Sequence, residues 1–190
     1  MGASTNMRPN WFIGFPISAG NWYETVITKV PAGIKSFEPI DLHITFAFLG
    51  PVGIENAMLA WGRAQQLTVP PIQISLAAMM PFGNPLKPSA YAFTLNKGRD
   101  ELAAVLVDYR DELLRLAGKK EDKYPNPTPH ITVARPPRDA DDALRERGTV
   151  WATNYPVPDV SLSVDRMALY TWSDDREMQQ FKIVKSSLLD

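Results

Sequence analysis

The 190-residue sequence contains no cysteine. This absence excludes disulfide bridges, thiolate nucleophiles and every zinc site with a cysteine ligand, and it favours a reducing, cytoplasmic setting. All apolar runs are far shorter than the roughly 18 to 20 residues that a membrane-spanning helix needs, so we expect no membrane partner. The start of the chain lacks a basic segment followed by an apolar one, which argues against a secretion signal. We interpret residues 1–6 as a disordered or vector-derived start.

An excess of either charge is also lacking. Lysine and arginine total 20 and aspartate and glutamate total 21, so the net charge is −1. Such a balance gives no global field for long duplex nucleic acid, whose phosphates normally meet many basic side chains. The charge balance does not exclude a short or small anionic ligand. The sequence has neither a glycine-rich phosphate loop nor a nucleophile elbow.

The order of expected elements predicts an α+β fold. Helical spacing of apolar residues covers 19–30, 54–67 and 99–116, and the stretch 136–148 has room for a short helix. A turn-rich connection is expected over 81–89. Strand-like runs cover 11–18, 34–50 with a break at Pro39, 72–80, 90–96, 130–135, 160–172 and 181–189. Because regular βαβ alternation is missing, we expect mostly antiparallel sheets, built into one domain over residues 7–190.

The only two histidines stand in matching pentapeptides. Residues 43–47 read His-Ile-Thr-Phe-Ala and residues 130–134 read His-Ile-Thr-Val-Ala. The two pentapeptides share four of five residues and lie 87 positions apart. Two copies are too few for a solenoid, but they suit two lobes related by a pseudo-two-fold axis.

Each pentapeptide predicts an imidazole and a hydroxyl on one face of a strand. Side chains alternate along a strand, so His43 and Thr45 share a face, as do His130 and Thr132. Small residues, Ala47 and Ala134, come next on that face by alternation and would leave room for a ligand, whereas Phe46 and Phe48 are assigned to the core. If the strands lie side by side, both motifs meet in one cleft.

Two imidazoles and two hydroxyls suit in-line attack at phosphorus. With an ordinary pKa near 6.5, one imidazole can act as a neutral base and the other as a protonated acid. The threonine hydroxyls can donate hydrogen bonds to the non-bridging phosphate oxygens, where charge must be held. A metal site is the alternative use of two histidines, but neither has a second ligand at a convincing spacing, so we predict no metal.

The segments FEPIDLHITFAFLG and NPTPHITVARPP resemble the 2H phosphoesterase superfamily, most closely its RNA 2',3'-cyclic phosphodiesterases, also called 2'-5' RNA ligases. The resemblance implies a bilobal α+β fold with two mostly antiparallel sheets and flanking helices around a central cleft, and no metal or other cofactor. It implies His43 and His130 as the acid–base pair, and Thr45 and Thr132 as phosphate ligands. Arg135 is a further phosphate ligand by resemblance, although strict alternation puts it on the reverse face unless a strand end or bulge intervenes.

The sequence therefore predicts a metal-independent, monomeric phosphodiesterase that opens 2',3'-cyclic phosphates on nucleotides or RNA ends. By resemblance the product is a 2'-phosphate, and reversal with an RNA 5'-hydroxyl gives a 2'-5' linkage. We assign His130 to water activation and His43 to protonation of the 3'-oxygen, while the near-symmetric motifs leave the order of roles open. The alternatives are cleavage of 2'-5' oligoadenylate or of ADP-ribose 1'',2''-cyclic phosphate, and an RNA-binding module without turnover.

Recognition of a base needs an aromatic surface on which the base can stack. Phe15, near the end of the first expected strand, and Tyr170 and Trp172, before the charged turn SDDRE, are the candidates. Most other aromatic residues are assigned to the core of a chain of this size.

Overall fold

The computed structural model describes residues 8–119 and 127–190, so the interpretation of residues 1–6 and the domain start at residue 7 lie outside it. Within the described residues the chain forms four α-helices and nine strands. The helices are α1 (Gly20–Ile27), α2 (Ile54–Ala64), α3 (Arg99–Leu116) and α4 (Asp142–Asn154). The strands are β1 (Trp11–Pro16), β2 (Lys35–Ser36), β3 (His43–Gly50), β4 (Ile72–Asn84), β5 (Lys87–Leu95), β6 (His130–Arg135), β7 (Ser161–Val164), β8 (Arg166–Trp172) and β9 (Phe181–Leu188).

The strands pair antiparallel in the order β7-β4-β5-β6-β3-β1-β8-β9, with β2 on β6. Two four-stranded halves meet where β3 pairs with β6, through Ile44 opposite Ile131. These isoleucines hold the same position in the two His-Ile-Thr motifs, so the pseudo-two-fold axis passes between them. The predicted α+β class with antiparallel strands is confirmed.

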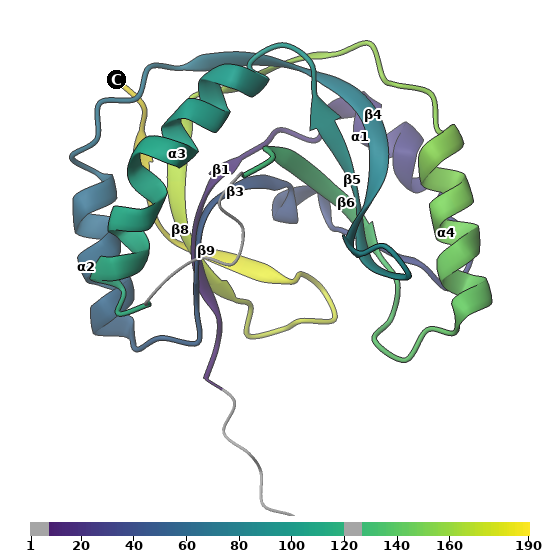
Figure 1. The fold of residues 1–190 in the computed structure, drawn as a ribbon, viewed down its shortest axis with the longest axis horizontal. Coiled ribbons are helices and arrows are strands. Elements are labelled where there is room, and N and C mark those ends of the chain that lie inside the picture. The colour runs from purple at the N-terminus through teal and green to yellow at the C-terminus, as the bar shows by residue number, and fades with distance from the viewer. Residues whose placement is uncertain (1–7, 120–126) are drawn as a thin grey trace, which may run out of the picture.

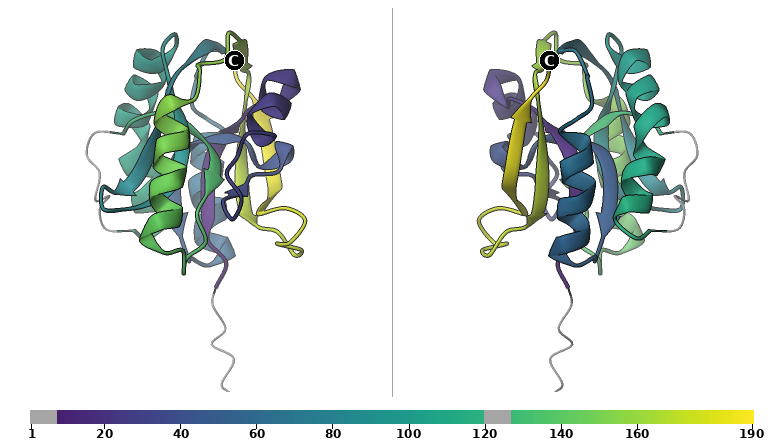
Figure 2. Two further views of the ribbon diagram at one scale, coloured as in Figure 1. Left: turned by 90° about the vertical axis from the view of Figure 1, so that its right-hand side faces the viewer. Right: turned by 90° about the vertical axis from the view of Figure 1, so that its left-hand side faces the viewer.

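The helices cover the outside of the curved sheet (Figure 1). Helices α2 and α3 pack together beside β3, while α4 packs on β4 and β5 of the other half. Figure 2 shows α4 on one side of the molecule and α2 with α3 on the opposite side. Helix α3 has the predicted bounds, because Leu102, Leu106 and Leu113 repeat on one buried face and Gly118, at φ +80°, follows its end.

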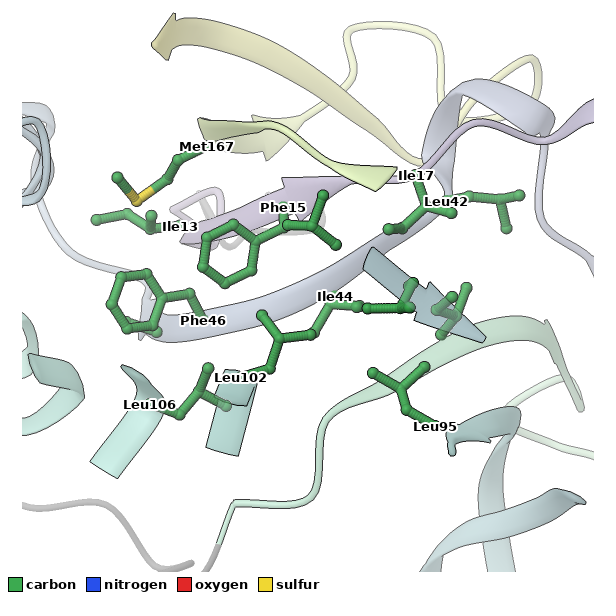
Figure 3. Close-up of a cluster of buried hydrophobic side chains, with 14 of the residues drawn as sticks. Ile13, Phe15, Ile17, Leu42, Ile44, Phe46, Leu95, Leu102, Leu106 and Met167 are labelled. Atoms are coloured by element: carbon green, nitrogen blue, oxygen red, sulfur yellow. The ribbon is translucent and has the colours of Figure 1, made fainter. Parts of the chain in front are cut away.

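The core lies between these helices and the sheet, and it contains Phe15 (Figure 3). The Phe15 side chain is 0% exposed and its ring stacks on Phe46, with 5.3 Å between ring centroids. A ring enclosed in this way has no face for a base, so the prediction of Phe15 as a stacking residue is wrong. Its position on β1 faces the helices rather than the cleft.

Residues 81–89, predicted as a turn-rich connection, are mostly strand. The β4–β5 hairpin continues to Asn84 opposite Lys87, which leaves only residues 85 and 86 in the turn. Pro81 and Pro88 are tolerated, and a register shift next to Gly83, at φ +99°, bends the hairpin. Helix α4 is longer than the short helix expected, and the Asp141 side chain caps it by accepting from the Leu144 N–H at 2.7 Å.

Candidate active site

Each His-Ile-Thr motif begins a central strand and is followed by a β-bulge. On β3 the pairing with β1 moves from Gly14↔Thr45 to Ile13↔Ala47 and skips Phe46. On β6 the pairing with β5 moves from Ala92↔Thr132 to Tyr91↔Ala134 and skips Val133. Each bulge stands one residue after the threonine, so the pseudo-symmetry of the sequence extends to the backbone distortion.

The bulges decide which side chains follow the threonines in the cleft. An extra residue reverses the alternation, so the fifth residue after each histidine returns to the histidine's face; these residues are Phe48 and Arg135. The prediction that Ala47 and Ala134 lie on the ligand face is therefore wrong, and both are buried in the core. Phe48, assigned to the core from sequence, is 44% exposed.

The His43 ring has a fixed orientation and tautomer. Its Nδ1 lies 2.6 Å from the carbonyl oxygen of Asp41. A carbonyl only accepts, so Nδ1 donates its hydrogen and Nε2 is left as the other ring nitrogen for a ligand. The ring packs on Phe12 at 4.6 Å and edge-on against Phe181 at 5.5 Å between centroids. The side chain is 8% exposed, in a pocket of the cleft.

The His130 ring repeats this arrangement in the other half. Its Nδ1 lies 2.7 Å from the carbonyl oxygen of Thr128, again two residues before the histidine. Phe82 of β4 stacks on the imidazole, with 4.1 Å between centroids and 21° between planes. The side chain is half-buried and lines the cleft. Both histidines thus have Nδ1 bound to a carbonyl and one aromatic ring on an imidazole face.

Burial keeps both imidazoles neutral in the free protein. Desolvation, together with the charge of Arg135 and against the opposing hydrogen bond to Asp41, lowers the pKa of His43 to about 4, and protonation of His130 would also disfavour a proton on His43. Desolvation and the charge of Arg135 also lower the pKa of His130, against the opposing hydrogen bond to Thr128. A bound phosphate anion would favour the protonated forms and raise both pKa values.

The lowered pKa of His43 makes stability depend on pH. Between pH 6.5 and 4 the unfolded chain binds a proton that the folded His43 does not, so the free energy of unfolding falls as the pH falls. The total loss from this residue is about 3 kcal/mol, and about 2 kcal/mol of it occurs between pH 7 and 5. We therefore expect the free energy of unfolding, measured with urea, to fall by about 2 kcal/mol less between pH 7 and 5 in His43→Asn than in wild type.

The matched control for this measurement is His130→Asn. Asparagine places an amide donor near the Nδ1 position in both variants, so each can keep the hydrogen bond to its carbonyl. Because His130 is less buried than His43, its removal should change the pH dependence by a smaller amount. Equal pH dependence in wild type and His43→Asn would contradict the burial effect.

The cleft consists of two adjoining pockets that share Thr45, Phe48 and Arg135. The His130 pocket, about 500 Å³, is also lined by Phe82, Leu106 and Thr132. The His43 pocket, about 230 Å³, is lined by His43 and a group of aromatic and basic side chains: Phe12, Phe181, Trp172, Arg138 and Arg176. The bulge places Arg135, predicted as a phosphate ligand, at the junction, with its guanidinium 5.0 Å from the centre of the Phe37 ring.

The two remaining candidates for base stacking differ from each other. Tyr170 is 1% exposed and stacks on Phe12 with 4.6 Å between centroids, so it supports the His43 ring from behind and offers no face to a base. That prediction is wrong. Trp172 lines the His43 pocket, with the Arg176 guanidinium 4.5 Å from its ring centre. Phe48 and Phe82 are aromatic residues of the cleft that the sequence did not identify.

Asp41 is a further residue whose importance the sequence did not reveal. Its side chain is 0% exposed, and its carboxylate accepts the backbone N–H of Gln180 at 2.8 Å and of Phe181 at 2.9 Å. The same residue accepts from His43 through its carbonyl. Asp41 therefore fixes the turn between β8 and β9 against the strand that carries His43.

Residues 8–119 and 127–190 contain no group of three or more His, Cys, Asp or Glu side chains arranged to hold a metal ion. Among the helices described in this part of the chain, none is long and apolar enough to cross a membrane.

Comparison with the sequences of known proteins identifies a family and a relative. The family described as the 2'-5' RNA ligase superfamily matches residues 26–176. The RNA 2',3'-cyclic phosphodiesterase of Archaeoglobus fulgidus is 31% identical over 104 residues, which are 55% of this chain and 57% of that relative, so the match spans little more than half of its length.

Solved structures extend the similarity over nearly the whole chain. E. coli LigT complexed with 3'-AMP has a TM-score of 0.72 at 21% identity, covering 95% of this chain and 98% of LigT. LigT complexed with NADP+ gives 0.70 at 19% identity, covering 97% and 99%. Usb1 of Kluyveromyces marxianus gives 0.57 at 11% identity, covering 96% and 98%. At these identities the structures establish a common fold.

Proposed function

Because this chain belongs to the 2'-5' RNA ligase superfamily, we propose that it hydrolyses 2',3'-cyclic phosphates on nucleotides or RNA 3' ends to 2'-phosphates. One observation carries the proposal. Two imidazoles in adjoining pockets each have Nδ1 bound to a carbonyl, which leaves both Nε2 atoms for one phosphate beside Arg135. The two pockets share Thr45, Phe48 and Arg135, which supports both rings facing one ligand.

In the proposed reaction, one imidazole accepts a proton from water as the new oxygen–phosphorus bond forms. The other, as imidazolium, donates a proton to the 3'-oxygen as the bond from phosphorus to that oxygen breaks. Thr45, Thr132 and Arg135 donate hydrogen bonds to the non-bridging oxygens and hold the negative charge of the transition state. No metal takes part in these steps.

The environments favour His43 as the base, which reverses the roles assigned from sequence. His43 is more deeply buried and has a pKa of about 4, so it stays neutral and can accept a proton. His130 is half-buried beside the larger pocket, whose volume of about 500 Å³ suits a nucleoside. A ribose held there brings its 3'-oxygen to His130, whose pKa the bound phosphate raises.

Base recognition in the proposed site falls to Phe48 and Phe82 instead of the buried Phe15 and Tyr170. Both phenylalanines line the His130 pocket, and stacking on an aromatic ring tolerates any base. We therefore expect weak discrimination among the four bases. A 5'-hydroxyl of RNA that enters in place of water would form a 2'-5' linkage by the same proton transfers.

The proposal is tested by incubating the protein with the four 2',3'-cyclic nucleotides in excess EDTA and identifying the products by chromatography. We expect turnover of all four, exclusively to the 2'-phosphates. Turnover that EDTA abolishes would contradict the metal-independent mechanism, and 3'-phosphate products would contradict the choice of leaving oxygen.

Two other substrates and a binding assay separate the alternatives in the same experiment. Turnover of 2'-5' oligoadenylate or ADP-ribose 1'',2''-cyclic phosphate, without turnover of the cyclic nucleotides, would place the activity elsewhere in the superfamily. Binding of RNA without turnover of any of these substrates would indicate a non-catalytic module.

A further inference from the structure

The His43 pocket concentrates positive charge in a protein whose net charge is −1. Arg135, Arg138 and Arg176 line it, and no acidic side chain is among the described residues that do so. Desolvation within the cleft, and next the charge of Arg176, lower the pKa of Arg135, against the opposing charge of Asp41. Like charges that line one pocket repel each other, and a bound anion would relieve this repulsion.

Three aspartates on the segments that carry the pocket residues have partners other than these arginines. The Asp41 carboxylate accepts from the backbone of Gln180 and Phe181, and Asp174 forms an ion pair with Lys182 at 2.7 Å. The Asp175 carboxylate accepts the backbone N–H of Glu177 at 3.0 Å and of Met178 at 3.3 Å. None of these interactions involves an arginine of the pocket.

Arg176 is held in place before any ligand binds. Its guanidinium lies 4.5 Å from the centre of the Trp172 ring and donates to Gln180 Oε1 at 3.3 Å. The Gln180 side chain donates back to the Arg176 carbonyl at 3.1 Å, and the Gln180 backbone is bound by Asp41. The turn that carries Arg176 is thus attached to the residue that orients His43. Trp172 supports this cation instead of presenting that face to a base.

Arg138 stands on a turn that is also fixed. The Arg145 guanidinium donates to the carbonyl of Arg138 at 3.0 Å, of Pro137 at 3.2 Å and of Pro88 at 2.7 Å. These bonds hold the segment after β6 against β5, so the Arg138 side chain extends from a rigid base. Rigid cations lose less conformational entropy when they bind an anion.

We propose that Arg138 and Arg176 form a subsite for a second phosphate, one that does not react, of a polynucleotide substrate. The inference rests on the proposed phosphodiesterase function and adds a determinant of specificity to it. A pocket of about 230 Å³ is below the usual range for drug-sized ligands, whereas a phosphate group fits it and pairs with guanidinium forks. An RNA end therefore gains an interaction that a mononucleotide lacks.

The test compares kcat/KM for a trinucleotide ending in a 2',3'-cyclic phosphate with kcat/KM for adenosine 2',3'-cyclic phosphate. Wild type should prefer the trinucleotide, and each of Arg138→Gln and Arg176→Gln should reduce the ratio roughly tenfold, as expected for a lost charge-assisted hydrogen bond. The control variants are Arg147→Gln on α4 and Arg166→Gln at the far end of β8, which remove the same charge outside the cleft and should keep the wild-type ratio.

Two outcomes would overturn the subsite: an unchanged ratio in both arginine variants, or the same reduction in the controls, which would indicate net charge alone. If neither the trinucleotide nor adenosine 2',3'-cyclic phosphate is turned over, the proposed function is refuted and the kinetic ratio cannot test the subsite. In that case fluorescence anisotropy with a labelled trinucleotide carrying a 2'-phosphate decides the inference. Weaker binding by Arg138→Gln and Arg176→Gln than by the controls supports the subsite, and equal binding refutes it.

Discussion

His43→Asn and His130→Asn should each lower kcat/KM for a 2',3'-cyclic nucleotide by about 10²- to 10⁴-fold, because each removes one proton transfer from the transition state. Asparagine can keep the donation from the Nδ1 position to the carbonyl of Asp41 or Thr128, so the strand and its aromatic neighbours stay in place. It lacks a group that exchanges protons at the Nε2 position. The measurement is initial rates across substrate concentration, with folding checked by circular dichroism.

The double variant gives a sharper result. If the two imidazoles act as one unit, losing the second costs little once the first is gone, so His43→Asn/His130→Asn should be nearly as active as the slower single variant. Multiplication of the two single losses would indicate independent roles. Activity near that of wild type in either single variant would refute the acid–base assignment.

Arg135→Gln should lower kcat by about 10²- to 10³-fold, the usual effect of removing one donor to a developing oxyanion. Arg135 is the cation shared by both pockets, and its guanidinium lies on Phe37. Arg135→Lys should recover only part of the rate, because lysine keeps the charge but loses the planar fork that stacks on an aromatic ring and pairs with phosphate.

The control for Arg135 is Arg147→Gln, since Arg147 is exposed on α4 and lies outside both pockets of the cleft. It should leave kcat at the wild-type value. A full rate in Arg135→Lys would show that charge alone matters, and a full rate in Arg135→Gln would remove Arg135 from the site.

The sequence predicted the central strands because their signal is local. Alternation places each histidine with its threonine, and the matching motifs suited two strands side by side, an arrangement found in the pairing of Ile44 with Ile131. The bulges at Phe46 and Val133 could not be predicted, because a bulged apolar residue looks like any other strand residue. The errors at Ala47, Ala134 and Phe48 follow from them, as does the arrival of Arg135 in the cleft.

Contacts between residues far apart in the chain also could not be predicted from the sequence. Asp41 acts through Gln180 and Phe181, about 140 positions away in the chain, and no local pattern marks such a pair. Phe15 and Tyr170 are aromatic residues near strand ends, like Trp172, and only the register of β1 and β8 decides that they are buried. Aromatic composition alone therefore could not separate core residues from cleft residues.

The central claim is that one phosphate group contacts both imidazoles, and ¹⁵N NMR of histidine-labelled protein tests it most directly, because the chain has only two histidines. The free protein should give two neutral rings at pH 7, each protonated at Nδ1, with the pKa of His43 near 4. Saturating adenosine 2'-phosphate should raise the pKa of both rings together. A response from only one ring, or from neither, would contradict the account.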